Sequence, residues 1–384
     1  MRYRRTPIEI ESPEQLGYST IRNNLAESSF SDKCLADYGV EVDVGRLLLP
    51  YGDHLGAERL RRLIAEDGES LSPDHVLVTA GASSALFIIA TSLLGPDAHA
   101  LICAPNYATN LETPRAVGAD VETIDLRFED GWRLDLETIA ARLRPDTRLV
   151  SITYPHNPTG SAITLAELET IVALVESHPI ARLLVDETYR ELAYDDPLPM
   201  ATTLSPRVLA VSSMSKTYGL PGLRVGWLTC RDERLMETLL AAKEQIFICG
   251  AVVEEELAAR VLEQRSVALK LIHAKTQRQL SVVRDWIDGH ELFEWVEPSA
   301  GVVCFPRIRP EIPIDVDGFY RALSKSMGHT SVPGAGSIRI RAFSGSGSLG
   351  PPRKSLQVGS RVSTGRLREP ALPPDERVVG ATPP

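Results

Sequence analysis

Short apolar segments alternate with segments of helical spacing from about residue 75 to residue 230. The apolar segments are rich in branched aliphatic residues and predict buried strands at 75–79, 100–104, 121–126, 148–154, 181–185 and 208–212. The segments in which apolar residues recur every three or four positions predict helices at 57–66, 85–94, 134–143 and 165–176. Strands that alternate with helices are typical of a doubly wound, mainly parallel sheet, and we therefore predict an α/β fold.

The pattern differs on either side of this alternation. Residues 1–48 are irregular apart from a short extended piece near 21–26, and we assign them to an N-terminal arm and part of a small domain. Further elements follow the alternation, namely helices at 235–244, 252–264 and 268–288, a strand region at 294–306 and a helix at 317–327. At 384 residues the chain is long enough for two domains, so we predict a large domain over 49–285 and the rest of the small domain over 286–343.

Small or polar residues follow the carboxyl ends of several predicted strands. They are Gly81, Ala82 and Ser83, then Tyr107, Asn157 and Asp186. Because the carboxyl ends of parallel strands meet at one edge of an α/β sheet, and ligands bind at that edge, we expect these residues to lie near one another. The step from strand to helix at Gly81 also exposes backbone N–H groups at the positive end of a helix dipole, which predicts an anion site.

The last predicted strand of the alternation leads into an unusual segment, 213–227, with the sequence Ser-Met-Ser-Lys-Thr-Tyr-Gly-Leu-Pro-Gly-Leu-Arg-Val-Gly-Trp. A primary amine forms an imine with an aldehyde, and the hydroxyls of Ser213 and Ser215 and the guanidinium of Arg224 suit a phosphate. An aldehyde that carries a phosphate is pyridoxal 5'-phosphate (PLP), so Lys216 is the candidate Schiff-base lysine. The alternative is a solvated lysine in a glycine-rich loop, which the short motif alone does not exclude.

Charge and cysteine content narrow the class of protein. The formal net charge of −10 argues against a nucleic acid or a membrane surface as partner, and no apolar run has the length of a membrane span. The basic N-terminus precedes no apolar stretch, so we read no signal peptide. The five cysteines are scattered without a CxxC pair, which indicates reduced thiols in a cytoplasmic protein and no metal site.

Three motifs together resemble the class I/II aminotransferases of PLP fold type I. They are SxSKxxGxxGxRxGW at 213–227, NPTG at 157–160 and DETY at 186–189, and the resemblance runs from about Tyr51 to Phe305. The resemblance implies a large domain with a seven-stranded, mainly parallel sheet and a smaller α+β domain. It also implies PLP as cofactor, an amino acid as the small-molecule substrate and a homodimer with shared active sites.

The resemblance assigns a role to each residue around the cofactor ring. Lys216 would hold PLP as a Schiff base and then transfer a proton through a quinonoid state. Asp186 would pair with the ring nitrogen and keep it protonated. Tyr189 and Asn157 would hydrogen-bond the ring's 3'-oxygen, with Asn157 also next to the substrate carboxylate, and Tyr107 would stack on the ring.

A second set of residues would hold the cofactor phosphate. On this chain the resemblance places there Gly81, Ala82, Ser83, Ser213, Ser215 and Arg224. Tyr51 would reach the phosphate bound by the neighbouring subunit, which is the reason for expecting a homodimer.

The resemblance favours transfer of the amino group of an α-amino acid to a 2-oxo acid. The same residues also support elimination and cyclisation of a hydroxylated arginine-like amino acid. The stretches 155–160, 215–227 and 300–306 resemble those of capreomycidine-synthase-like PLP cyclases. A regulator with an aminotransferase-like domain would carry a helix-turn-helix or a basic patch, and a dinucleotide-binding protein would carry GxGxxG; neither is seen.

The C-terminal stretch departs from the family pattern. The family carries an arginine that clamps the substrate carboxylate, in a strand that precedes a closing helix, and Arg339 is the nearest match. Residues 344–384 are rich in Pro, Arg, Gly and Ser without apolar periodicity, so we predict a disordered tail or a shifted reading frame. Sequencing the gene tests the second hypothesis, because another frame must then encode the missing strand and helix.

The polar stretch 24–29 contains one acidic side chain, Glu27. It either faces a substrate or lies in a solvated turn. The local sequence is typical of a turn, and we favour the turn.

Overall fold

The computed structural model describes residues 27–315 without a gap, together with 1–3, 5, 12, 15, 17, 23–24, 318–319, 322, 329–330, 333–334 and 337–338. Met1–Gly347 form one compact unit, and Ser348–Pro384 are divided from it. Arg339 and the tail 344–384 lie outside the described residues, as does most of the helix expected at 317–327. The boundary between a large and a small domain stays a prediction.

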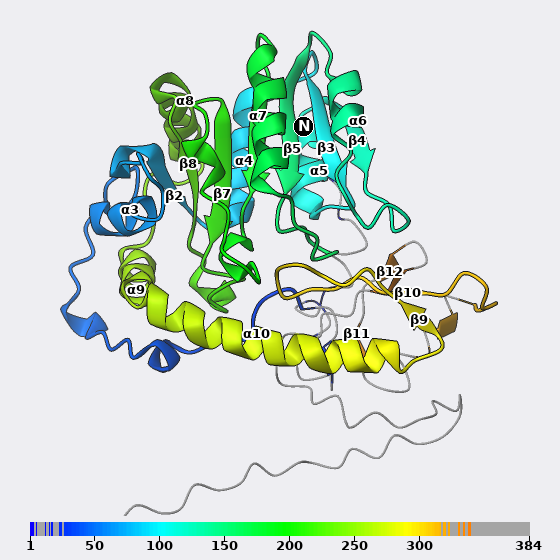
Figure 1. The fold of residues 1–384 in the computed structure, drawn as a ribbon. Coiled ribbons are helices and arrows are strands. Elements are labelled where there is room, and N and C mark those ends of the chain that lie inside the picture. The colour runs from blue at the N-terminus through cyan, green and yellow to red at the C-terminus, as the bar shows by residue number, and fades with distance from the viewer. Residues whose placement is uncertain are drawn as a thin grey trace, which may run out of the picture. The chain divides into compact units, whose positions relative to one another are not determined.

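A seven-stranded sheet forms the centre of the fold (Figure 1). Its strands are, in spatial order, β2 (Val76–Thr79), β8 (Gly226–Cys230), β7 (Val208–Ser213), β6 (Arg182–Asp186), β5 (Thr147–Thr153), β3 (His99–Ala104) and β4 (Asp120–Asp125). Neighbouring strands are parallel except at β8, which runs antiparallel to both β2 and β7. The predicted mainly parallel α/β sheet is therefore confirmed, and β8 is the strand that the apolar pattern did not single out.

Both faces of the sheet are covered, because alternate residues of the strands enter two separate cores. Leu101 and Leu183 pack in the core under helices α6 (Leu136–Arg142) and α7 (Leu165–Ser177). The next residues along each strand pack in the opposite core, under α4 (Ala82–Leu93) and α8 (Glu233–Glu244). Burial on both faces explains why these strands read as continuous apolar runs instead of alternating ones.

Two helices differ from the expectation. Helix α4 begins at Ala82, three residues before the predicted start, because Gly81 with φ +78° caps it and the small residues Ala82 to Ser84 already belong to its first turn. Helix α5 (Ala108–Ala116) was not predicted. It contains Pro114 and lacks a continuous apolar stripe, so its sequence does not carry the helical pattern.

The remaining helices connect this sheet to smaller ones. Helices α3 (Glu58–Ala65) and α9 (Val252–Glu263) pack together, and α10 (Arg265–Asp288) continues from α9 toward β9 (Figure 1). A four-stranded antiparallel sheet has the order β12 (Pro333–Gly334), β13 (Ser337–Ile338), β10 (Arg307–Ile308) and β9 (Phe293–Glu294). A second pair joins β1 (Asn23–Asn24) to β11 (His329–Thr330) in parallel. The strand region expected at 294–306 is therefore wrong, because β9 ends at Glu294 and β10 begins only at Arg307.

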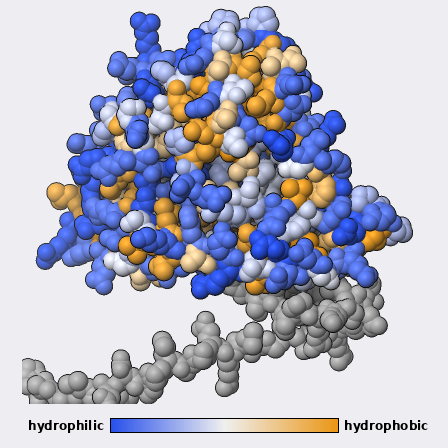
Figure 2. Space-filling view, in the orientation of Figure 1, coloured by the Kyte–Doolittle hydropathy of each residue, from blue (hydrophilic) through white to orange (hydrophobic). Residues whose placement is uncertain are grey.

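Six short 3-10 helices complete the secondary structure of the described residues. They are η2 (Leu35–Tyr38), η3 (Val44–Arg46), η4 (Pro73–His75), η5 (Arg190–Leu192), η6 (Ala201–Thr203) and η7 (Pro221–Leu223). Among the described helices, none combines the length and the apolar character that a membrane crossing requires. Figure 2 shows a mostly hydrophilic face, with hydrophobic side chains gathered mainly over the region of the seven-stranded sheet.

Candidate active site

The sheet brings the predicted site residues to one edge. Asp186 is the last residue of β6 and Ser213 the last residue of β7. Tyr107 and Asn157 follow β3 and β5, which are parallel to β6 and end at the same edge. Lys216 lies three residues beyond β7, close enough for its charge to act on the Asp186 carboxyl.

Asp186 is a buried carboxylate that its neighbours orient. Its Oδ1 accepts hydrogen bonds from the backbone N (3.1 Å) and the Oγ1 (2.6 Å) of Thr188, and its Oδ2 from Nδ2 of Asn110 (3.4 Å). Burial raises the pKa of Asp186, although these bonds and the charge of Lys216 oppose the rise. A buried carboxylate in this state favours a cationic partner, such as a protonated ring nitrogen.

An anion cradle forms where β2 turns into α4. A Cβ atom at position 81 would lie 2.5 Å from Nη2 of Arg224, and one at position 226 would lie 2.5 Å from the backbone N of Ala82. Only glycine at both positions therefore lets the arginine and the first turn of α4 approach each other. Arg224 donates to the carbonyls of Pro221 and Ala80, so the guanidinium and the positive end of α4 converge here. A phosphate fits this cradle.

Hydroxyl groups surround the cradle. Ser83 Oγ lies 3.2 Å from the hydroxyl of Tyr107, and Ser213 Oγ accepts a hydrogen bond of 3.3 Å from the backbone N of Ser215. Ser213 is joined to Gly226 by strand register, and Gly226 is also paired with Thr79 just before the cradle. The structure therefore brings together the residues that the motifs placed around a phosphate.

Asn157 and Tyr189 differ in how they are engaged. The side-chain oxygen of Asn157 is buried and has no hydrogen-bond partner among the described residues, as expected of a group that awaits a ligand. The hydroxyl of Tyr189 is buried and donates to the backbone carbonyl of Ser28 (2.9 Å). To donate to a ligand oxygen, the hydroxyl hydrogen must turn away from the Ser28 carbonyl.

Two other predicted residues lie apart from this cluster. Tyr51 is 84% exposed, so it does not complete the site within one chain. Arg339, the candidate for the substrate carboxylate, lies outside the described residues.

Glu27 corrects the interpretation of the 24–29 stretch as a solvated turn. Its side chain is only 15% exposed, and Oε1 lies 3.7 Å from Nζ of Lys216. The segment after it pairs with the lysine loop, through Phe30 N to Lys216 O and Lys33 N to Gly219 O, both at 2.9 Å. These long-range backbone bonds bring the glutamate into the site, and the turn-like composition gives no sign of them.

Sequence reasoning also missed the residues behind Asp186. Asn110 belongs to the unpredicted helix α5, and its Nδ2 donates to Asn106 as well (3.0 Å). Asn106 Oδ1 in turn accepts from Oγ1 of Thr153 at the end of β5 (3.1 Å). The one available signal was the position of Asn106 two residues after a strand, beside Tyr107.

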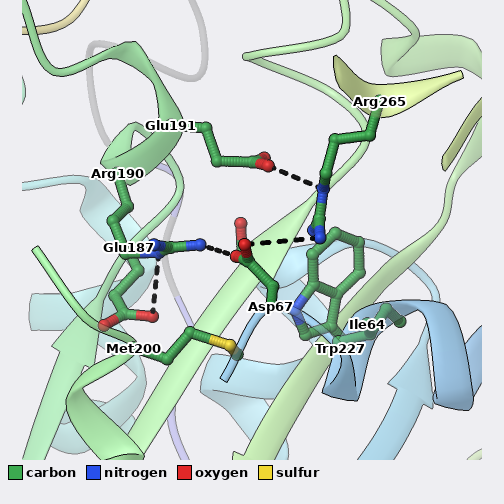
Figure 3. Close-up of a pocket in the computed structure, with 9 residues that line it drawn as sticks. Ile64, Asp67, Glu187, Arg190, Glu191, Met200, Trp227 and Arg265 are labelled. Carbon is green, nitrogen blue, oxygen red and sulfur yellow. Dashed lines mark ion pairs between the residues drawn. The ribbon is translucent and has the colours of Figure 1, made fainter. Parts of the chain in front are cut away.

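An ion cluster lies beneath the site, around a small pocket (Figure 3). Arg190 pairs with Asp67 and lies 3.9 Å from Glu187, while Arg265 pairs with Glu191 (2.9 Å) and Asp67 (3.5 Å). Because Arg265 is the first residue of α10, the cluster ties the start of that helix to the loop after Asp186. The ion pairs of Asp67 and Glu191 with the two arginines indicate a structural role for the cluster.

Glu187 gives the cluster a pH dependence. Burial raises the pKa of Glu187 from 4.5 to about 8, against a hydrogen bond from the backbone N of Ala201. The folded protein then binds a proton that the unfolded chain releases near pH 4.5, so stability falls as the pH rises toward 8. We expect Glu187→Gln to remove this loss of stability, which grows by about 1.4 kcal/mol for each pH unit between the two pKa values.

The measurement is thermal unfolding at pH 5 and at pH 9. The gain in Tm of the Gln variant over the wild type should be larger at pH 9, by about 2–4 °C for each kcal/mol. Glu169→Gln, on the exposed face of α7, is the matched control. Equal differences at both pH values would contradict the raised pKa.

The fold and the site define a class before any comparison is made. The seven-stranded sheet is that of PLP fold type I, as its superposition on solved aminotransferase structures shows, and a lysine, a buried carboxylate and an anion cradle lie at its carboxyl edge. The chain belongs to the class I and II aminotransferase family, whose family model matches residues 26–344. Its cofactor is accordingly pyridoxal 5'-phosphate.

Four known proteins illustrate the similarity. The chain is 31% identical over 298 residues to the capreomycidine synthase of Streptomyces vinaceus, which covers 76% of this chain and 75% of that protein. It is 28% identical over 272 residues to the arginine–pyruvate transaminase of Pseudomonas aeruginosa, 68% of each. A PLP-dependent aminotransferase from Streptococcus suis superposes with a TM-score of 0.83 at 25% identity, over 90% of this chain and 94% of that one. The PLP-dependent cyclase OrfR superposes with a TM-score of 0.80 at 25% identity, over 89% and 93%.

Proposed function

We propose that the protein transfers the amino group of an α-amino acid to a 2-oxo acid, with Lys216 as the residue that moves the proton. The position of Lys216 just after β7, at the same sheet edge as the buried Asp186 at the end of β6 and the anion cradle, carries this proposal. PLP, when bound, supplies an electron sink for the bonds at the substrate Cα. The protein supplies the base, the carboxylate that pairs with the ring nitrogen and the groups that bind the phosphate.

Each residue then has one task. Lys216 would hold the cofactor through its amine and, once released, would move the proton of the substrate Cα. Asp186 would keep the ring nitrogen protonated, because a buried carboxylate favours a cationic neighbour. Asn157 and Tyr189 would hydrogen-bond the ring oxygen, and Tyr107 would pack on the ring.

The phosphate is held by the first turn of α4 and by side chains around it. The backbone N–H groups at Ala82 and Ser83 lie at the positive end of the helix, and Arg224 adds a guanidinium. The hydroxyls of Ser213 and Ser215 complete the phosphate-binding site. Asn157 is also the described residue that we place at the substrate carboxylate.

Elimination with cyclisation is a second candidate. Two similar proteins, the capreomycidine synthase and the cyclase OrfR, support it. In this reaction the substrate loses a group from Cβ after Lys216 has taken the Cα proton, and an internal nucleophile adds in its place. The described residues serve both reactions equally, since both begin with the same proton transfer.

The fate of the cofactor separates the two reactions. Purified protein loaded with PLP is incubated with single amino acids, beginning with L-arginine because one similar protein is named for it, and no 2-oxo acid is added. Transfer converts PLP stoichiometrically to pyridoxamine phosphate, which chromatography detects. Elimination and cyclisation leave the cofactor as PLP while product accumulates. A protein that takes up no PLP would contradict both.

We further propose a homodimer in which Tyr51 reaches the partner's phosphate site. Large apolar side chains are exposed near Tyr51 at Leu48 and Leu49, and again at Ile246 and Ile248. Lys243, which precedes the second segment, donates to the backbone carbonyl of His54, which follows the first. Exposed apolar side chains of this kind suit a subunit interface. Light scattering should give twice the chain mass of 42.0 kDa, and a monomer would contradict the proposal.

A further inference from the structure

Glu27 presents a fixed carboxylate to the reacting lysine. Its Oε1 accepts hydrogen bonds from the backbone N of Ser28 (2.8 Å) and from the backbone N and Oγ of Ser29 (3.0 and 2.8 Å). The same oxygen lies 3.7 Å from Nζ of Lys216. Burial raises the pKa of Glu27, but the lysine charge and these bonds outweigh it, so the pKa is lowered and the group is ionised.

Long-range contacts hold this carboxylate in place. Tyr189 donates to the carbonyl of Ser28, and Lys275 Nζ donates to Oγ of Ser31 (3.0 Å). Gly219 has φ +62°, and a Cβ there would collide with the carbonyl of Ser31, so the lysine loop is shaped to receive this segment. The glutamate is therefore a built part of the site and not a surface side chain that happens to approach it.

The ion pair with Lys216 does not persist through the reaction. A base must be neutral before it accepts a proton, so Lys216 loses its charge before it acts on Cα. No other described cation forms an ion pair with Glu27. A mostly buried carboxylate without a cationic partner is costly, and the site at that moment favours a positive charge from elsewhere.

The second carboxylate oxygen is available for that charge. The hydrogen bonds that described residues donate to Glu27 all go to Oε1, which leaves Oε2 to accept from a ligand. The substrate Cα must come within about 3.5 Å of Lys216 Nζ to react, which places Glu27 at most about 7 Å from Cα. A side chain as long as that of lysine or arginine spans this distance.

We propose that Glu27 binds the cationic side chain of the substrate and so selects amino acids that carry a guanidinium or ammonium group. This assignment rests on the proposed function, because it presumes an amino-acid substrate at Lys216. A guanidinium or ammonium N–H donates to Oε2, while Oε1 stays bound to Ser28 and Ser29. Neutral amino acids leave the carboxylate unpaired and are therefore poorer substrates.

The test compares the wild type with Glu27→Gln, which keeps the shape and removes the charge. The ratio of kcat/KM for L-arginine to that for L-methionine is measured on both holoenzymes. A charge-assisted contact predicts that the ratio falls about tenfold to a hundredfold in the variant. Glu41→Gln, an exposed residue of the same N-terminal region, is the control and should keep the wild-type ratio.

A binding measurement accompanies the kinetics and needs no turnover. The probe is 5-guanidinopentanoate, an arginine analogue without the amino group, with pentanoate as the uncharged comparison. Calorimetry should show at least about tenfold weaker binding of the guanidinium ligand to the variant, with no such change for pentanoate. Both variants are first matched to the wild type in cofactor absorbance and Tm.

The outcomes are distinct. Equal loss for arginine and methionine, with unchanged binding of the analogue, would overturn the assignment and make Glu27 a residue that acts only on Lys216. If no amino acid is turned over, the proposed function fails. In that case a weaker affinity of the variant for the analogue would still support the cation site, and an equal affinity would overturn it.

Discussion

Lys216→Ala is expected to abolish the yellow absorbance of the purified protein and to lower kcat by about 10⁴-fold. The lysine is the only group we assign both to the covalent link with the cofactor and to the proton transfer at Cα. Its loss removes the two together, and none of the other residues assigned to the site carries an amine. Absorbance spectra and single-turnover assays with excess PLP measure the effect.

The control for this variant is Lys270→Ala, which removes an exposed lysine of α10 and should leave absorbance and rate at the wild-type level. The Lys216→Ala variant also loses the ion pair between Lys216 and Glu27. A Lys216→Ala protein that stays yellow and active would show that another amine holds the cofactor. That result would remove the basis of the proposed mechanism.

Asp186→Asn is expected to lower kcat by about 10²- to 10³-fold, the effect of breaking a buried charge pair. The amide preserves the bonds from Thr188 but cannot keep a proton on the ring nitrogen. Burial raises the pKa of Asp186 in the protein without cofactor, so the ionised group lowers stability increasingly as the pH rises. The Asn variant should therefore be no less stable than the wild type when the cofactor is absent.

These opposite effects distinguish a functional carboxylate from a structural one. Steady-state kinetics report the loss of kcat, and thermal unfolding of the cofactor-free protein at pH 8 reports the stability. Asp195→Asn, at an exposed position, is the matched control for both measurements. A variant that unfolds at a clearly lower temperature but keeps its kcat would show that Asp186 only supports the fold.

The seven-stranded sheet was largely predictable, and the reason lies in its burial. Strands such as β5 and β6 are covered on both faces, so each leaves an apolar run that needs no knowledge of its neighbours. The exceptions follow the same logic. β8 follows directly on the lysine segment and was read as part of it, and α5 contains a proline and lacks an apolar stripe, so neither stands out in the pattern.

The small-domain elements were harder to predict. Strands β9 and β10 have two residues each, which is too short for a periodic pattern. The turn-like composition around Glu27 gave the wrong environment, because the segment is held by bonds to the lysine loop and to Tyr189. Local composition indicates the conformation that a segment favours by itself, but it does not indicate which distant residues will contact it.

By itself, the sequence determined the cofactor chemistry to be expected of this protein. The segment around Lys216 is contiguous in sequence, and the other site residues follow predicted strands. Because parallel strands end at one edge of the sheet, these residues are expected to lie together. The tertiary structure alone decided that Arg224 meets the first turn of α4, that Asn110 supports Asp186, and that Glu27 faces Lys216. Each of these contacts joins residues far apart in the chain, and periodicity and motif spacing describe only residues that are near one another in sequence.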